Sequence, residues 1–267
     1  MPEWRPGDVI ETPWAAMRHH IRAYLHDDAA AREVGLKAGV IGGYNYLQLA
    51  GIEFERQFER RWLERGRLTA RWGSPVYEGD EVRARISVDA ASDEFSASFT
   101  VEKRDGEVVT TGAACWAARD EAPATLDYES AAPDELDGLR ALAVGEHLSP
   151  RQVVAQPEDV DGFCERTGDP LYGPDRVPTA YLARLLWLPT RAELDARGAG
   201  SGLFGRVDIR QYAPLAPGVT YGYDAEVLGL RRRGRLEILD IRLSALGDDG
   251  TPLCVIDQTQ LFPHPAG

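Results

Sequence analysis

The order of sequence landmarks in the first half of the chain returns in the second half. Residues 7–13 begin with Gly, end with Pro and precede a short helical pattern. Residues 145–150 also begin with Gly, end with Pro and precede such a pattern. Asp105-Gly106 and Asp249-Gly250 each mark a hairpin turn between alternating strands. The paired landmarks lie roughly 140 residues apart. Landmarks that keep one order at a nearly constant offset indicate two copies of one structural unit.

Each copy contains one apolar helix and a set of strands. Residues 44–62 predict a helix with Leu47 and Phe54 on its apolar stripe, and its second half carries charges expected to face solvent, Glu55 among them. Residues 177–188 are apolar on nearly every face and predict a buried helix. Period-two alternation predicts four antiparallel strands in each copy, over residues 68–72, 82–88, 95–101, 108–116 and residues 204–212, 221–227, 236–243, 253–261.

The predicted fold class is α+β. A sheet with one apolar face and an apolar helix can hide their surfaces only against each other, so each sheet should wrap round its central helix. We expect an N-terminal unit over residues 1–118 and a C-terminal unit over residues 144–267. Residues 119–143 are rich in Ala, Asp, Glu and Pro and predict a linker. Two copies in one chain would mimic a homodimer, with their sheets continuous.

Composition excludes several classes of partner. The formal net charge is −13, which argues against nucleic-acid binding. The sequence shows no secretory leader and no run of about 18 apolar residues, so we expect no membrane association. The three cysteines have no paired spacing and predict reduced thiols in a cytoplasmic protein. No histidine pair has metal-site spacing, and we expect neither a metal nor a cofactor.

One stretch of the second copy resembles a known motif. Pro157-Glu158-Asp159-Val160 leads to Phe163 and then to Thr167-Gly168-Asp169-Pro170-Leu171-Tyr172. This stretch, the order of elements and the Pro-x-x-x-Gly between the first two main strands resemble the MaoC-like hydratase/dehydratase family in its double-hotdog form. The resemblance covers nearly the whole chain. It implies two tandem hotdog units and a small-molecule acyl thioester, bound to coenzyme A or a carrier protein, as substrate.

The resemblance also implies catalytic residues. In the family an Asp and a His activate the water that adds to, or leaves from, a 2-enoyl thioester. Asp169 matches that Asp, Tyr172 stands where the His is expected, and the family's Asn is absent. Asp169 would be the acid/base group and Tyr172 its polar partner. Alternatively, Asp169 caps the turn and Tyr172 fills the mouth of the tunnel.

The first copy offers His26, followed by Asp27 and Asp28, as another base. The alternative is that all three are surface residues.

The starts of the two central helices are the expected substrate-binding sites. In hotdog proteins generally, N–H groups at this helix N-terminus hold the thioester carbonyl, and the helix dipole suits that oxygen. The sequence therefore predicts Tyr44 and Asn45, which follow Gly42-Gly43, and Thr179 and Tyr181 in the second copy, as substrate-binding residues.

The function that this reading favours is a hydratase or dehydratase, that is, a hydro-lyase, acting on an acyl thioester or a related small carbonyl compound. Two alternatives stay open. One is a non-catalytic hotdog protein that binds an acyl group or supports a partner hotdog subunit. The other is a diverged lyase, isomerase or cyclase. A homodimer is a further possible assembly.

Overall fold

The computed structural model describes residues 4–19, 24–91, 94–117, 135–148, 152–169 and 176–264. Two series of elements follow one another, and each runs from two short strands through helices to four longer strands. The first consists of β1 (Val9–Glu11), β2 (Ala15–Ala16), η1 (Tyr24–His26), α1 (Asp28–Glu33), α2 (Gly43–Phe58), α3 (Arg60–Arg65), β3 (Gly66–Trp72), β4 (Glu81–Ala90), β5 (Ser96–Lys103) and β6 (Val108–Trp116). The second consists of β7 (His147–Leu148), β8 (Gln152–Val154), α4 (Pro157–Thr167), α5 (Thr179–Ala196), β9 (Leu203–Gln211), β10 (Thr220–Arg233), β11 (Leu236–Leu246) and β12 (Pro252–Pro263).

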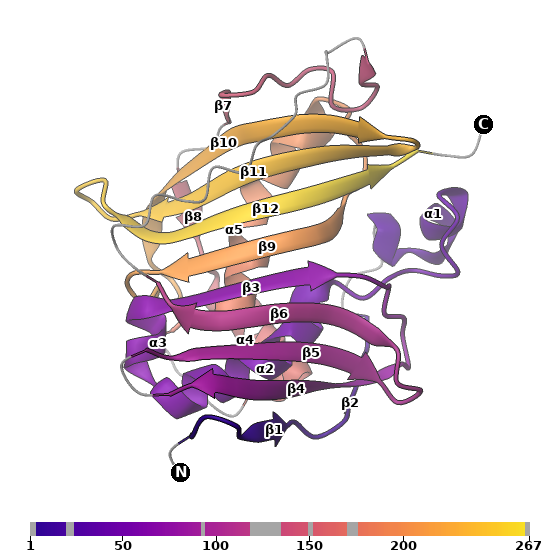
Figure 1. Ribbon diagram of the computed structural model, residues 1–267. Helices are drawn as coiled ribbons and strands as arrows, with labels where there is room; N and C mark the ends of the chain where they lie inside the picture. Colours follow the sequence, from indigo (N-terminus) through magenta and orange to yellow (C-terminus); the bar gives the residue numbers. More distant parts are fainter. Residues whose placement is uncertain are drawn as a thin grey trace.

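The described strands form one antiparallel sheet. Its order is β1-β4-β5-β6-β3-β9-β12-β11-β10-β7, with β2 paired to β4 and β8 paired to β10. β3 and β9 form the seam between the two halves, with Leu68 opposite Ile209. Figure 1 shows the two halves side by side in this sheet, with the long helices behind it. The prediction of continuous sheets is confirmed.

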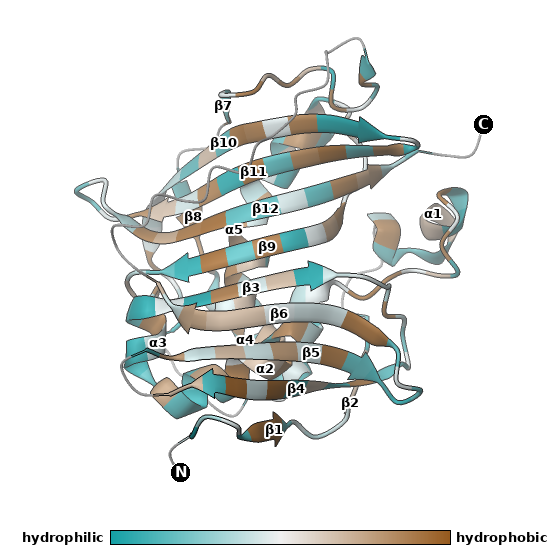
Figure 2. Cartoon of the chain, in the orientation of Figure 1, coloured by the Kyte–Doolittle hydropathy of each residue, from teal (hydrophilic) through white to brown (hydrophobic). Residues whose placement is uncertain are grey.

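The two long helices lie on the same side of the sheet and contact each other. Leu47 and Phe54 of α2 and Leu182 and Leu186 of α5 are almost fully buried. The strands alternate as predicted: Val82, an even-numbered residue of β4, is buried, as are the other even positions to residue 88. Figure 2 shows hydrophobic and hydrophilic residues alternating along several strands. Each half is thus an antiparallel sheet round a central helix, and the predicted α+β fold of two tandem hotdog units is confirmed.

The first central helix is shorter than predicted. α2 ends at Phe58, because Glu59 adopts a left-handed backbone conformation with φ of 48°. The chain then turns into α3, which brings the indole of Trp62 back over Phe54 with ring centroids 4.9 Å apart. No helix in the described ranges is long and apolar enough to cross a membrane.

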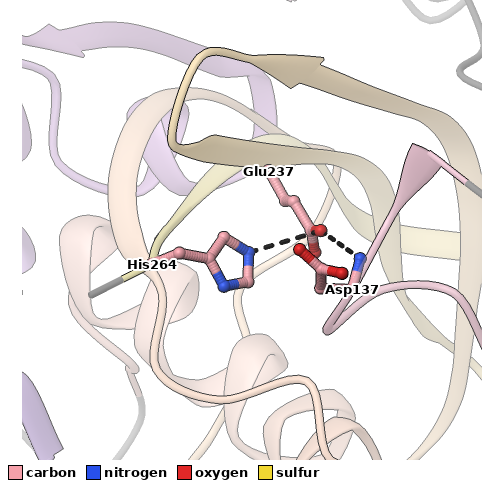
Figure 3. A group of neighbouring side chains, drawn as sticks. All are labelled: Asp137, Glu237 and His264. Atoms are coloured by element: carbon pink, nitrogen blue, oxygen red, sulfur yellow. Dashed lines mark hydrogen bonds and ion pairs between the residues drawn. The ribbon is translucent and has the colours of Figure 1, made fainter. Parts of the chain in front are cut away.

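The end of the predicted linker packs against the second unit. Leu136, Leu139 and Leu142 are buried, whereas residues 118–134 lie outside the described ranges, so the predicted domain boundaries stay a prediction. Figure 3 shows that the carboxylate of Glu237, on β11, contacts the backbone amide of Asp137 in this segment. Its fully buried carboxylate accepts hydrogen bonds from the amides of Asp137, Gly138 and Leu139, the last two at 3.0 Å.

Replacing Glu237 with Ala should lower the free energy of unfolding by about 3 kcal/mol, because three backbone donors lose their acceptor. Urea denaturation measures this loss. Glu81→Ala removes an exposed strand carboxylate that pairs with Arg104 in solvent and should change the free energy of unfolding little. Equal losses in the two variants would contradict a fastening role for Glu237.

Candidate functional site

A cavity of about 250 Å³ lies where the N-terminus of α2 faces the middle of α5. The first unit lines it with η1, with residues 40–44 and with residues 72–75. The second unit lines it with one side of α5, with the start of β9 and with Leu261 of β12. Because both units supply walls, the cavity depends on their pairing.

The start of α2 presents backbone donors at this cavity. Gly42 caps the helix without a side-chain hydrogen bond, and Gly43 is its first residue. Among the described residues, no backbone carbonyl accepts a hydrogen bond from the Gly43 amide. A helix N-terminus carries partial positive charge on such N–H groups. The arrangement therefore suits an oxygen that carries negative charge.

Trp72 adds a side-chain donor beside Gly43. A Cβ atom on Gly43 would lie 2.3 Å from the indole Nε1 of Trp72, so only glycine fits there. That Nε1 is buried and has no hydrogen-bond partner in the described part of the chain. A buried N–H without an acceptor costs free energy, and a ligand oxygen would relieve that cost. Sequence reasoning missed Trp72 because its alternation in β3 indicated only a core residue.

His26 lines the same cavity. Its Nδ1 lies 2.5 Å from the carbonyl oxygen of Val40. A carbonyl can only accept, so Nδ1 carries the proton, and Nε2 of the neutral ring keeps its lone pair. Burial holds the pKa of His26 below its ordinary value of 6.5. The ring is therefore neutral at pH 7 and can take a proton through Nε2. The alternative of a surface histidine is excluded by this position.

The two acidic residues after His26 have structural partners. The carboxylate of Asp27 caps α1 by accepting from the amides of Ala29 and Ala30, at 2.9 and 3.2 Å. Asp28 accepts from the amide of Gly39 at 2.9 Å. These bonds hold the loop that carries His26, which explains why carboxylates follow the histidine.

Tyr44, in the first turn of α2, also lines the cavity. Burial raises the pKa of its phenol above the ordinary value. The hydroxyl therefore stays protonated at any physiological pH and can donate a hydrogen bond. Asn45 is buried beside it but does not line the cavity, since its side chain turns back to donate to the carbonyl of Gly42 at 3.0 Å.

The outer part of the cavity is built round Tyr24. This residue has a φ of 58° and is 51% exposed. The guanidinium of Arg191 from α5 lies 3.8 Å from the centre of its ring. Arg191 is in turn paired with Asp195 at 2.9 Å. A strained non-glycine backbone persists only where surrounding contacts hold it, and this cation–π contact is one such contact.

The start of α5 is closed, in contrast to the start of α2. The carboxylate of Glu55 accepts from the amide of Thr179 at 2.8 Å, and the side chain of Gln48 accepts from the amide of Ala180 at 3.0 Å. Both come from α2 and are nearly or fully buried. The expectation that Glu55 faces solvent is wrong. Protein side chains fill the place where a carbonyl oxygen would bind in the second unit.

Asp169 belongs to this closed region. Its carboxylate has no exposed surface; it pairs with Arg176 at 2.7 Å and accepts from Gln48 at 3.2 Å. Arg176 also pairs with Glu55. Asp169 does not line the cavity described above. The position expected at a tunnel mouth is thus a buried ion-pair network, and a catalytic role for Asp169 stays a prediction.

The two predicted substrate-binding residues of the second copy, Thr179 and Tyr181, are buried and hydrogen-bonded to other protein groups. The hydroxyl of Thr179 accepts from the indole of Trp62 at 3.0 Å and from Gln211 at 3.2 Å. The phenol of Tyr181 is buried and accepts from Arg184 at 2.8 Å, and burial raises its pKa to about 12. Neither lines the cavity. Tyr172 lies outside the described residues.

One group of side chains has the composition of a metal site, namely Asp137, Glu237 and His264. Figure 3 shows His264 and the amide of Asp137 both directed at the carboxylate of Glu237. Amide donors already use the oxygens of Glu237, and Asp137 pairs with Arg232 at 3.2 Å. Donors aimed at the carboxylate oppose a cation, so this group fits the fastening role given above.

No protein-family model and no curated protein matches this sequence. Solved structures do. A protein named as a MaoC domain dehydratase from Chloroflexus aurantiacus J-10-fl is 15% identical, with a TM-score of 0.68 over 98% of this chain and 97% of its own. Rv0216 of Mycobacterium tuberculosis, described as a double hotdog, is 13% identical, with a TM-score of 0.69 over 97% of this chain and 98% of its own.

A third similar structure is the dehydratase domain of PpsC from Mycobacterium tuberculosis in complex with C12:1-CoA. It is 16% identical, with a TM-score of 0.50 and coverage of 85% of each chain. These likenesses show that the chain has the double-hotdog fold, and the fold that the MaoC-like resemblance implied is confirmed.

Replacing Glu55 with Ala should lower the free energy of unfolding by about 3 to 5 kcal/mol, because the buried charge of Arg176 and the first amide of α5 lose a partner. Chemical denaturation measures the loss. Glu53→Ala is the matched control, since Glu53 lies two residues away and forms a partly exposed pair with Arg56. A loss below about 1 kcal/mol for Glu55→Ala would refute this role.

Proposed function

We propose that the protein is an acyl-thioester hydratase or dehydratase with its working site at the start of α2. The observation that carries the proposal is the single cavity that joins the donors at Gly43 and Trp72 to the neutral imidazole of His26. This differs from the motif-based expectation, because His26 replaces Asp169 as the acid/base group. The double-hotdog fold supports the choice of substrate class.

The geometry supports the following chemistry for water addition to a 2-enoyl thioester. The thioester oxygen lies against the N-terminus of α2 and accepts from the donors there. His26 Nε2 takes a proton from water as the oxygen attacks the β-carbon, and the electron pair moves to the thioester oxygen. The α-carbon then takes that proton back. The phenol of Tyr44 donates a hydrogen bond to the new hydroxyl. Dehydration is the reverse sequence.

A second candidate is a protein that binds an acyl thioester without converting it. The closure of the α5 N-terminus by Glu55 and Gln48 favours it, because one of the two expected carbonyl sites is already filled. Binding of a crotonyl thioester without conversion would support this candidate over the enzyme.

Replacing His26 with Gln should lower kcat for crotonyl-CoA hydration by about 100-fold or more, since proton transfer of this kind contributes about 10² to 10⁴. Loss of the conjugated thioester absorbance follows the reaction. His147→Gln is the matched control, because His147 is exposed on β7 and pairs with Asp224 away from the cavity. Equal activity of His26→Gln and the wild type would refute the assignment.

The pH dependence gives a separate test. A base must be unprotonated, and burial lowers the pKa of His26. We therefore expect kcat/KM to rise with pH through a midpoint below 6.5 and to stay level above it. The profile is measured between pH 4.5 and 8. An acid limb centred above 6.5, or one that persists in His26→Gln, would contradict His26 as the base.

A further inference from the structure

Arg184 is a buried cation in the wall of the cavity. It lies on α5, five residues or about one and a half turns after the first helical residue, and is 8% exposed. Its side chain lines the same cavity as His26 and Tyr44. Arginine is rarely buried to this degree unless an anion accompanies it.

The partners of Arg184 are phenols rather than carboxylates. Its Nη1 donates to the hydroxyl of Tyr181 at 2.8 Å. Its guanidinium lies 5.3 Å from the ring centre of Tyr181 and 5.9 Å from that of Tyr44. None of the ion pairs formed by the described residues includes Arg184. Its neighbours in the chain differ in this respect, since Arg176 pairs with Glu55 and Asp169, and Arg191 pairs with Asp195.

Among the described residues no carboxylate forms an ion pair with Arg184, and a second arginine lies close to it. Arg166 on α4 and Arg184 repel each other. His26 and Arg191 lie on the same cavity and are neutral and cationic, respectively. The carboxylate of Asp195 is engaged by Arg191. Arg184 thus places a positive charge in the cavity wall of an acidic protein.

We propose that Arg184 binds a carboxylate at the far end of the acyl group, so that the preferred substrates are thioesters of dicarboxylic acids. This inference rests on the proposed function, since it takes the cavity as the acyl site. Guanidinium and carboxylate form paired, charge-assisted hydrogen bonds, whereas the phenols that Arg184 meets supply no negative charge. A neutral acyl chain would leave the buried cation without an anion, which disfavours such a chain.

The depth of Arg184 argues for the acyl end over the phosphates of the carrier. Arg184 is 8% exposed, whereas Tyr24 at the outer part of the cavity is 51% exposed. A cavity of about 250 Å³ lies below the usual range for ligand sites, so its size suits a short acyl chain better than a nucleotide.

The test is calorimetric titration of the full chain with glutaryl-CoA, pentanoyl-CoA and coenzyme A. The two acyl groups have five carbons each and differ in a terminal carboxylate against a methyl group, and neither is unsaturated, so binding is separated from turnover. We expect the wild type to bind glutaryl-CoA at least tenfold more tightly than pentanoyl-CoA. Arg184→Gln should reduce that preference to below threefold, and Arg184→Lys should retain part of it.

Arg197→Gln is the matched control, because Arg197 ends the same helix outside the cavity and pairs with Glu146 and Glu193. It should keep the full preference. Equal binding of the two acyl thioesters by the wild type would overturn the inference and leave the proposed function standing. A preference that survives in Arg184→Gln would overturn the role of Arg184. If Arg184→Gln weakens coenzyme A as much as glutaryl-CoA, the anion is a carrier phosphate and the inference is wrong. If neither thioester binds better than coenzyme A, both the inference and the proposed function fail.

Discussion

The hydrogen bond from the first amide of α5 to the carboxylate of Glu55 determines how the two halves of this molecule differ. A buried carboxylate is costly unless donors surround it, and here Thr179, Gln48 and Arg176 supply them. The same bond fixes the start of one central helix against the middle of the other. It also occupies the donors that the corresponding end of α2 leaves for a ligand.

The duplicated units therefore have divided roles. The first unit supplies the open helix start and the imidazole, and the second supplies a wall through the side of α5. Arg184 and Arg191 belong to that wall, although both lie on the helix whose own N-terminus is closed. The second unit, whose own helix start is closed, thus still shapes the cavity at the open helix start of the first unit.

Much of the fold was predictable because it depends on periodicity. Alternation gave the strands, and the repeated order of landmarks gave two units and a shared sheet. The site was less predictable, because it depends on contacts between residues far apart in sequence. Gln48 meets Ala180 across 132 positions, and nothing local indicates that this polar residue fills the second helix start. A clue was present: Gln48 and Glu55 are spaced by seven, which places them on one face of the helix.

The resemblance to the MaoC-like motif gave the correct fold and drew attention to Asp169, whose carboxylate the structure places among buried ion-pair partners. His26 was identified by its chemistry alone, and only the loop that Asp27 and Asp28 hold brings it to the cavity. The local sequence can suggest a candidate base, but it cannot show whether that side chain lines a cavity.

The seam between β3 and β9 has a consequence for the way the chain is made. β3 is covered on its second edge only when β9, which follows it by more than 130 residues, has been synthesised. Until then the emerging first half presents the unpaired backbone of a seven-residue strand. Two nascent chains on neighbouring ribosomes can pair through that edge, so the order of synthesis favours exchange between copies until the second half arrives to compete for it.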